Sequence, residues 1–263
     1  MLDLNVIYEG DCLEVMKEFP DKSIDLILTD LPYGTTACKW DAIIPFEPLW
    51  EQYKRIIKDN GAIVLTASQP FTSALVMSNI KMFKYCWYWY KNCPSGISLS
   101  RTQPMRSIEE IIVFCAGKTI FNKQLMPSKI TDRKLGGKNG AFGNCSAKAD
   151  NISGLKHFSK SKNNPDNILL EMVNPRNVLE INVEPRAKGT LHPTQKPAAL
   201  FEYLIKTYTN EGDIVLDSCC GSGTTGIACQ NLNRNFILID KDPHWCDVTY
   251  KRLMENRDRL SNA

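Results

Sequence analysis

This sequence has little net charge, only three histidines and no long hydrophobic run. No segment approaches the roughly 18 consecutive apolar residues of a membrane-spanning helix, and the N-terminus lacks the basic and then apolar order of a signal peptide. We therefore expect a cytoplasmic protein with no membrane partner. The 32 Lys and Arg nearly balance the 29 Asp and Glu, so nucleic-acid binding is not indicated by net charge and would need a local basic patch.

The sequence also lacks any pair of cysteines in CxxC spacing, although it contains ten cysteines in 263 residues. The cysteines are scattered along the chain, and the three histidines are too few to suggest zinc sites of the usual pattern. We interpret the cysteines as reduced thiols that pack as small apolar side chains, and we expect no metal.

Apolar runs and helical patterns alternate at both ends of the chain, at the spacing of β-α-β units. In the first half the expected strands are 23–29, 61–67, 85–90 and 110–115, with helices at 47–58 and near 69–79. In the second half the expected strands are 213–216 and 235–239, with helices at 198–209, 224–231 and about 243–256. This order predicts an α/β fold with a mostly parallel sheet.

The middle of the chain does not follow this pattern. Residues 127–165 are rich in Gly, Asn, Ser and Lys, and they carry eight Lys or Arg against two Asp or Glu. A structureless segment of this length is unusual in a compact domain unless it has a function or becomes ordered on binding. The basic excess favours contact with phosphates or recognition of a target, and a solvated surface loop is the alternative.

A glycine-rich loop, residues 217–225 (DSCCGSGTT), follows an apolar strand near the C-terminus. Its glycines let the backbone approach a ligand at a helix N-terminus, but no Lys follows them as in a P-loop. Asp240 ends the next strand, where an acidic residue can hold ribose hydroxyls. The alternatives are an ordinary tight turn for the loop and a helix cap for Asp240. Together the two features indicate a cofactor that contains adenosine.

A second segment, Asp30-Leu31-Pro32-Tyr33, directly follows the strand predicted at 23–29. It places one acidic, one rigid and one aromatic residue at the C-terminal edge of a strand. The alternative is a strand-ending turn without a catalytic role.

Together the two segments resemble the signature motifs of S-adenosylmethionine-dependent DNA amino-methyltransferases, in the beta-type order that places the catalytic motif first. The string HPTQKP at 192–197 resembles the remaining cofactor segment of this family. The resemblance implies a Rossmann-like methyltransferase fold with circularly permuted motifs and an inserted target-recognition region. It divides the chain into a catalytic subdomain at 1–126, a basic target-recognition insert at 127–190 and a cofactor-binding subdomain at 191–263.

The resemblance also implies which residues meet the cofactor. The glycine-rich loop wraps the methionine part, Asp240 holds the ribose, and the Thr and Lys of the HPTQKP string lie near the methionine. Asp11 matches a residue that meets the adenine, although taken alone it is better explained as a helix cap. The cofactor residues implied in this way are Asp11, His192, Thr194, Gln195, Lys196, Asp217, Cys219, Gly221, Ser222, Gly223, Thr224, Thr225 and Asp240.

Transfer of a methyl group to an exocyclic amine requires the nitrogen to be oriented and its lone pair freed. Asp30 can accept one amino hydrogen and the Leu31 carbonyl the other, while Pro32 fixes the backbone. Tyr33 offers a face on which a base rotated out of the duplex can stack. Most relatives have Pro in place of Leu31, but the role belongs to a backbone carbonyl. Asp rather than Ser at the first position favours adenine over cytosine.

Candidate DNA contacts follow the aromatic run at 85–90. The run itself is a candidate base-binding platform, although packing in the core is the favoured interpretation. Arg106 suits a DNA contact or a surface ion pair. The candidate DNA-binding residues are Lys91, Asn92, Ser95, Arg101, Lys134 and Lys138.

We predict a site-specific DNA methyltransferase that acts on the N6 amino group of adenine in a short duplex sequence, in the cytoplasm of a bacterial or phage-infected cell. Methylation of cytosine N4 by the same machinery is the close alternative. An inactive DNA-binding relative, or an enzyme acting on RNA or on protein amides, are further alternatives. The implied partners are S-adenosylmethionine and double-stranded DNA, with a homodimer and a cognate restriction endonuclease as candidates.

Overall fold

The computed structural model describes residues 2–34, 41–97, 100–129, 170–183 and 195–262. The chain forms two compact units, one made of residues 1–122 and 176–263 and the other of residues 123–175. In the smaller unit, strands β6 (Met126–Lys129) and β7 (Leu170–Val173) pair antiparallel. The other described helices and strands belong to the larger unit.

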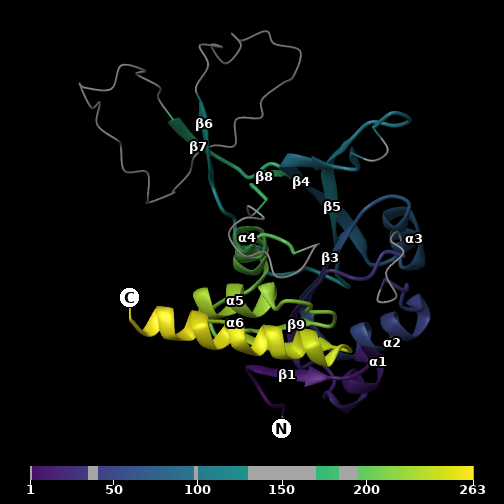
Figure 1. The fold of residues 1–263 in the computed structure, drawn as a ribbon, viewed down its shortest axis with the longest axis vertical. Helices are drawn as coiled ribbons and strands as arrows, with labels where there is room; N and C mark the ends of the chain where they lie inside the picture. Colours follow the sequence, from purple (N-terminus) through teal and green to yellow (C-terminus); the bar gives the residue numbers. More distant parts are fainter. Residues whose placement is uncertain (1, 35–40, 98–99, 130–169, 184–194, 263) are drawn as a thin grey trace. The chain divides into compact units, whose positions relative to one another are not determined.

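The larger unit is built on one eight-stranded sheet (Figure 1). From one edge to the other, its strands are β1 (Val6–Glu9), β10 (Asn235–Asp240), β9 (Ile214–Asp217), β2 (Ile24–Thr29), β3 (Ile57–Ala67), β5 (Arg106–Phe114), β4 (Phe83–Ser95) and β8 (Val178–Glu180). The strands from β1 to β3 are parallel, β5 is antiparallel to β3 and β4, and β8 is parallel to β4. The parallel strands therefore end at one common edge, where open α/β sheets place their ligands.

Helices cover both faces of this sheet (Figure 1). One face holds α1 (Cys12–Val15), the 3-10 helix η1 (Met16–Glu18), α2 (Phe46–Ile56) and α3 (Phe71–Ser78), and the other holds α4 (Ala198–Tyr208), α5 (Thr224–Asn231) and α6 (Pro243–Ser261). Side chains of β2 alternate between the faces, because Ile27 packs in the first core while Leu26 and Leu28 pack in the second. Burial on both faces explains why residues 26–28 of β2 are all apolar rather than alternating with polar residues.

The predicted α/β class and mostly parallel sheet are confirmed. The predicted helices and strands are present with shifted ends; the helix expected at 47–58 ends at Ile56, because β3 begins at Ile57. The short edge strands β1 and β8 were not predicted. They span four and three residues, which is too short for an alternation of apolar and polar residues to show.

The smaller unit and the predicted insert at 127–190 have different bounds. The unit begins at Lys123 and ends at Pro175. Residues 178–180, expected in the insert, instead form β8 at the edge of the main sheet, where Leu179 is buried. A role of the smaller unit in target recognition stays a prediction.

The aromatic strand β4 contributes mainly to the core. Trp87 and Trp89 are 4% and 3% exposed, and the indole of Trp87 donates to the Tyr208 hydroxyl at 2.7 Å. Tyr85 and Tyr90 are partly exposed on the same strand. Core packing, the favoured interpretation of this run, is therefore confirmed for the two tryptophans.

The cysteines within the described segments are free thiols, and half of those are buried, namely Cys12, Cys115, Cys220 and Cys229. In these segments no helix is long and apolar enough to cross a membrane. The same residues contain no group of three His, Cys, Asp or Glu side chains arranged to hold a metal ion.

A buried hydroxyl cluster ties the end of β2 to the end of β9. The Tyr53 hydroxyl of α2 lies 2.6 Å from the Ser218 hydroxyl, and the Ser218 backbone N–H donates to Thr29 Oγ1 at 3.1 Å. Thr29 precedes Asp30, and Ser218 follows Asp217. The cluster therefore sets the spacing between the two strand-ending turns that carry the predicted site.

Replacing Tyr53 with Phe should lower the free energy of unfolding by about 1 kcal/mol, because a buried hydrogen bond is lost while the ring is kept. Urea denaturation followed by circular dichroism measures this change. Tyr250→Phe is the matched control, since Tyr250 is 60% exposed. An equal decrease in the free energy of unfolding in the two variants would contradict a structural role for the cluster.

Candidate active site

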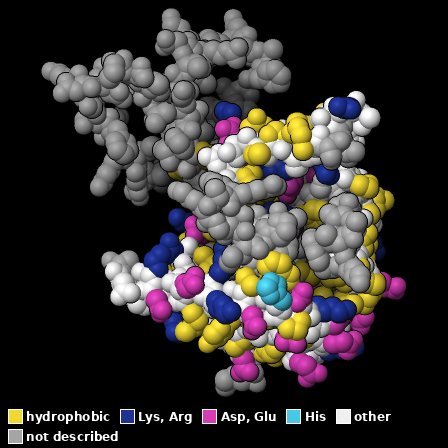
Figure 2. Space-filling model, in the orientation of Figure 1, with side chains coloured by type: hydrophobic (Ala, Val, Ile, Leu, Met, Phe, Trp, Pro, Cys, Tyr) yellow, Lys and Arg dark blue, Asp and Glu magenta, His cyan; other side chains and the backbone are white. Residues whose placement is uncertain are grey.

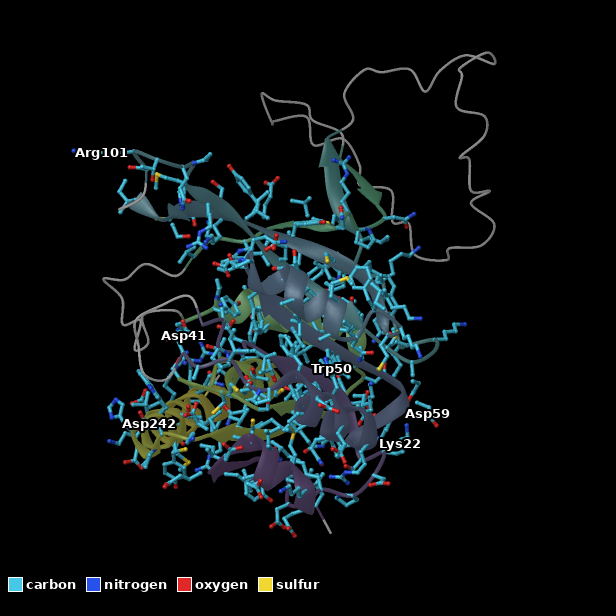
Figure 3. The ribbon with its side chains drawn as sticks, turned by 90° about the vertical axis from the view of Figure 1, so that its right-hand side faces the viewer. Lys22, Asp41, Trp50, Asp59, Arg101 and Asp242 are labelled. Carbon is cyan, nitrogen blue, oxygen red and sulfur yellow. The ribbon has the colours of Figure 1, made fainter. Side chains whose placement is uncertain are left out.

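The loops that follow the parallel strands enclose a cavity of about 1510 Å³. Its walls include the Asp30 turn, the glycine-rich loop and the end of β10. Figure 3 shows Asp41 and Asp242, which both line the cavity, on one side of the ribbon, and Lys22 and Asp59 on the opposite side. Lys22 precedes β2 and Asp59 lies near the start of β3, so the cavity opens at the carboxyl edge of the sheet.

A buried carboxylate holds the Asp30 turn in shape. Asp41 Oδ1 accepts hydrogen bonds from the backbone N–H groups of Tyr33, at 2.7 Å, and Gly34, at 2.9 Å. Gly34 has a φ of 66°, a left-handed conformation that favours glycine. Asp41 is 7% exposed. The backbone after Asp30 is therefore fixed by two hydrogen bonds to one side chain.

Both carboxylate oxygens of Asp30 have partners. Oδ1 accepts from the Tyr33 hydroxyl at 2.7 Å and from the Thr66 hydroxyl, and Oδ2 accepts from the Lys196 ammonium at 2.6 Å. The Tyr33 ring stacks against Phe71 with centroids 5.2 Å apart. Burial, followed by the charge of Asp30, raises the pKa of Tyr33, so its hydroxyl remains protonated and can donate.

Four side chains of alternating charge form a row in the lining of the cavity, namely Asp30, Lys196, Glu109 and Lys91. Lys196 Nζ lies 2.6 Å from Asp30 Oδ2 and 3.6 Å from Glu109 Oε2, and Lys91 Nζ lies 2.8 Å from Glu109 Oε1. Burial alone would lower the pKa of Lys196, but the charge of Asp30 and then that of Glu109 hold this pKa above its usual value. The Lys196 ammonium is therefore charged at neutral pH. We call these four residues the charge chain.

The glycine-rich loop brings its backbone close to α6. Gly223 precedes α5 with a φ of 77°, and a Cβ added there would lie 2.5 Å from Thr249 Cγ2. Glycine is therefore required by both the conformation and the space. Asp217 Oδ1 accepts from the Cys219 backbone N–H at 3.1 Å, and Oδ2 accepts from the Thr225 hydroxyl.

Asp217 is only 2% exposed. Burial raises the pKa of its carboxyl to about 7, although the hydrogen bonds from Thr225 and Cys219 act in the opposite direction. The ionised form of such a buried carboxyl is stabilised strongly by a positively charged group placed beside it.

Two other predicted acidic residues line the same cavity. Asp240 Oδ2 accepts from the Gly221 backbone N–H at 2.8 Å, so it also holds the glycine-rich loop. Asp11 Oδ1 accepts from the Leu13 backbone N–H at 2.9 Å and caps α1, which is the alternative that the sequence favoured.

Adjacent residues of the HPTQKP string connect the two halves of the site. The Ser222 hydroxyl of the glycine-rich loop donates to Gln195 Oε1 at 3.2 Å. The next residue, Lys196, reaches Asp30. The ammonium of Lys196 pairs with the predicted catalytic carboxylate, and its implied place near the cofactor stays a prediction.

The predicted DNA contacts divide into different environments. Lys91 is 5% exposed and paired with Glu109, so its ammonium faces the cavity rather than the surface, and its predicted contact with DNA stays a prediction. The Ser95 hydroxyl accepts from Lys91 at 3.1 Å, and Asn92 Oδ1 accepts from the Val183 backbone N–H at 2.8 Å. Arg101 is exposed between β4 and β5 (Figure 3). Arg106 donates to the Ser68 hydroxyl at 3.2 Å.

His192, Thr194, Lys134 and Lys138 lie outside the described residues.

Sequence reasoning missed three residues of the site. Thr66 and Glu109 lie on β3 and β5, and Asp41 lies on the segment after the Asp30 turn. One feature of the sequence could have identified Thr66: it is a polar residue within the otherwise apolar strand GAIVLTA at 61–67. Burial of such a residue requires a hydrogen-bonding partner, and Thr66 finds it in Asp30.

Comparisons with known proteins agree with this arrangement. A family model described as DNA methylase (N6_N4_Mtase) matches residues 24–251. The chain is 29% identical over 259 residues to the type II methyltransferase M.HpaI of Haemophilus parainfluenzae, covering 93% of this chain and 72% of that one. It is 26% identical over 266 residues to M1.MboII of Moraxella bovis, covering 93% and 95%. The crystal structure of the M1.HpyAVI–SAM complex superposes with a TM-score of 0.62 at 28% identity, covering 94% of this chain and 98% of that one.

The raised pKa of Asp217 should appear in the pH dependence of stability. In the folded state the carboxyl titrates at about 7, whereas in the unfolded chain it titrates near its ordinary value of 3.8. Its contribution is therefore fully present below the unfolded pKa and is lost as the pH rises through 7, with a slope of up to about 1.4 kcal/mol per pH unit. Asp217→Asn should flatten the profile of unfolding free energy between about pH 4 and 7.

Urea denaturation at several pH values measures these profiles. Asp59→Asn is the control, because the Asp59 side chain is 90% exposed. If Asp217→Asn keeps the slope of the unsubstituted protein, the carboxyl is already ionised throughout this range.

Proposed function

The chain belongs to the N6/N4 DNA methylase family, and we propose that it transfers the methyl group of S-adenosylmethionine to the N6 amino group of adenine in duplex DNA. One observation carries this proposal. The Asp30 turn and the glycine-rich loop, which are 187 residues apart at Asp30 and Asp217, line a single cavity. That arrangement brings an acceptor for an amino group and a cofactor loop to the same place.

The residues present suit the cofactor. The left-handed glycines at 221 and 223 expose the backbone of the loop, and the buried carboxyl of Asp217 suits a positively charged ligand. We infer that residues 217–225, with Asp240 and Gln195, hold S-adenosylmethionine, and we assign His192 and Thr194 to the same site from the family motif alone. When bound, the cofactor supplies a methyl group activated by a sulfonium.

The Asp30 turn supplies the groups that orient the amine. The Asp30 carboxylate accepts one amino hydrogen and the Leu31 carbonyl accepts the other, so the nitrogen lone pair is directed at the methyl group. The negative charge of Asp30 also stabilises the positive charge that develops on this nitrogen during transfer, and the nitrogen then releases one proton to solvent. Asp41 holds the turn by its bonds to Tyr33 and Gly34, which keeps both acceptors aimed.

The target base has to leave the duplex to reach this turn. Asp30 is a cavity-lining residue whose side chain is 25% exposed, and a stacked adenine does not present its amino group that deeply. We infer that the base is flipped into the cavity, and we assign Tyr33, whose hydroxyl donates to Asp30, as the aromatic face on which it stacks.

Surface charge limits where DNA can approach. Figure 2 shows acidic side chains gathered at the lower end of this face, around β1 and α1. Exposed acids of that region are Asp3, Glu9, Glu14, Glu18 and Asp21. Because phosphates avoid such a surface, we assign a DNA contact to the exposed Arg101 between β4 and β5, and we keep Lys134 and Lys138 as candidates from the sequence alone.

Adenine is favoured over cytosine by Asp rather than Ser at position 30, as the family resemblance implies. The relatives are type II methyltransferases by name. We propose that this chain likewise modifies one short sequence and protects it from a cognate restriction endonuclease.

Mass spectrometry of nucleosides tests the proposal. Unmethylated DNA of varied sequence, incubated with the protein and S-adenosylmethionine, should acquire N6-methyladenine. Asp30→Ala should lower this product about 100-fold or more, because the acceptor for the amino hydrogen is lost. Asp59→Ala, on the opposite edge of the sheet, is the control and should retain activity.

Two outcomes would overturn parts of the proposal. N4-methylcytosine in place of N6-methyladenine would keep the chemistry and refute the choice of base. The absence of any methylated base, with cofactor binding shown by calorimetry, would refute activity on DNA.

A further inference from the structure

The charge chain contains one acceptor without a hydrogen-bonding partner. Glu109 Oε2 is buried, and among the described residues no group donates a hydrogen bond to it. Lys196 Nζ lies 3.6 Å from this oxygen, beyond hydrogen-bonding distance, but only 2.6 Å from Asp30 Oδ2. A buried acceptor left unsatisfied costs about 1–3 kcal/mol, so a nearby ammonium should have a second stable position there.

The proposed reaction needs a change at Asp30. Both of its oxygens already accept hydrogen bonds, Oδ1 from two hydroxyls and Oδ2 from Lys196. An incoming amino group therefore competes with these donors for the oxygens of Asp30, and at Oδ2 its competitor is the Lys196 ammonium. During transfer the Lys196 ammonium is a less favourable donor to Asp30 than the two hydroxyls, because its positive charge repels the positive charge that develops on the amine.

We propose that Lys196 is a positioning residue that moves its ammonium from Asp30 to Glu109 when the target amino group enters the site. This inference rests on the proposed methylation of an amine. The move frees Asp30 Oδ2 for an amino hydrogen and gives Glu109 Oε2 the donor that it lacks.

The surroundings of Glu109 suit this role. Lys91 binds the other oxygen, Oε1, at 2.8 Å and holds the side chain in place on β5. Asp30, Glu109, Lys91 and Lys196 together carry no net charge, and the move leaves this sum unchanged. The displacement needed is small, because shortening 3.6 Å to a hydrogen bond of about 2.9 Å takes less than an ångström along that line.

Crystallography of the Asp30→Asn variant tests the second position without any catalysis. The substitution removes the charge at position 30, so Lys196 should transfer to Glu109. We expect a distance of about 3.0 Å or less between Lys196 Nζ and Glu109 Oε2. An ammonium that remains at position 30, or that turns into the cofactor loop, would overturn the proposal.

Kinetics of Glu109→Gln test whether the move matters. The neutral amide attracts the ammonium less, so kcat for methyl transfer should fall about tenfold, with the cofactor Kd changed less than twofold. Glu110→Gln is the matched control, because Glu110 is the next residue on β5 and accepts from Thr72 instead. An unchanged kcat in Glu109→Gln would overturn the proposal.

Glu109→Gln could also slow methyl transfer because the protein is less stable, so a second variant separates the two effects. Glu109→Gln leaves buried Lys91 without its partner, whereas Lys91→Met with Glu109→Gln removes both charges. Slow transfer in both variants, with melting temperatures near that of the unsubstituted protein for the double variant, supports the positioning role. If the unsubstituted protein methylates no DNA, the proposed function fails, and the Asp30→Asn structure still decides where Lys196 goes.

Discussion

The ion pair between Lys196 and Asp30 joins residues 166 positions apart and closes the active site. Lys196 is 8% exposed, so this charge is stable only because Asp30 and Glu109 compensate for the loss of water. Its neighbour Gln195 meets Ser222 in the glycine-rich loop. One short segment therefore contacts both the Asp30 carboxylate and the glycine-rich loop, and it sets the distance between them. The buried contacts of Tyr53, Thr29 and Ser218 also fix the distance between the ends of β2 and β9.

The order of motifs along the chain has little influence on this geometry. Strands β2 and β9 are neighbours in the sheet and run parallel, although one lies near each end of the sequence. Parallel neighbours present their carboxyl ends at one edge, so Asp30 and Asp217 meet there. The antiparallel strands β4 and β5 extend the sheet and add Lys91 and Glu109 to the same cavity. A catalytic motif that comes first in the chain is therefore compatible with a complete site.

Prediction from sequence worked where one residue type or one spacing decided the structure. Gly223 is needed because its backbone is left-handed and Thr249 is close, and the β2 run is apolar because both faces are buried. The burial of Lys91 was not foreseen, since a basic residue after an aromatic strand looks like a surface contact when its partner on β5 is unknown. Glu109 and Thr66 were missed for the same reason, because their partners lie far away in the sequence. Asp41 was missed although its partners, Tyr33 and Gly34, are only eight and seven residues away.

The sequence by itself determined the α/β class, the glycine-rich loop and the residues of the Asp30 turn, because these depend on local backbone preferences and on apolar periodicity. Only the tertiary structure decided that Lys196 pairs with Asp30, that Lys91 is buried, and that one oxygen of Glu109 has no hydrogen-bond donor among the described residues. The environment of a charged side chain is set by the strands packed around it, and the balance between desolvation and pairing follows from that packing rather than from the neighbouring letters of the sequence.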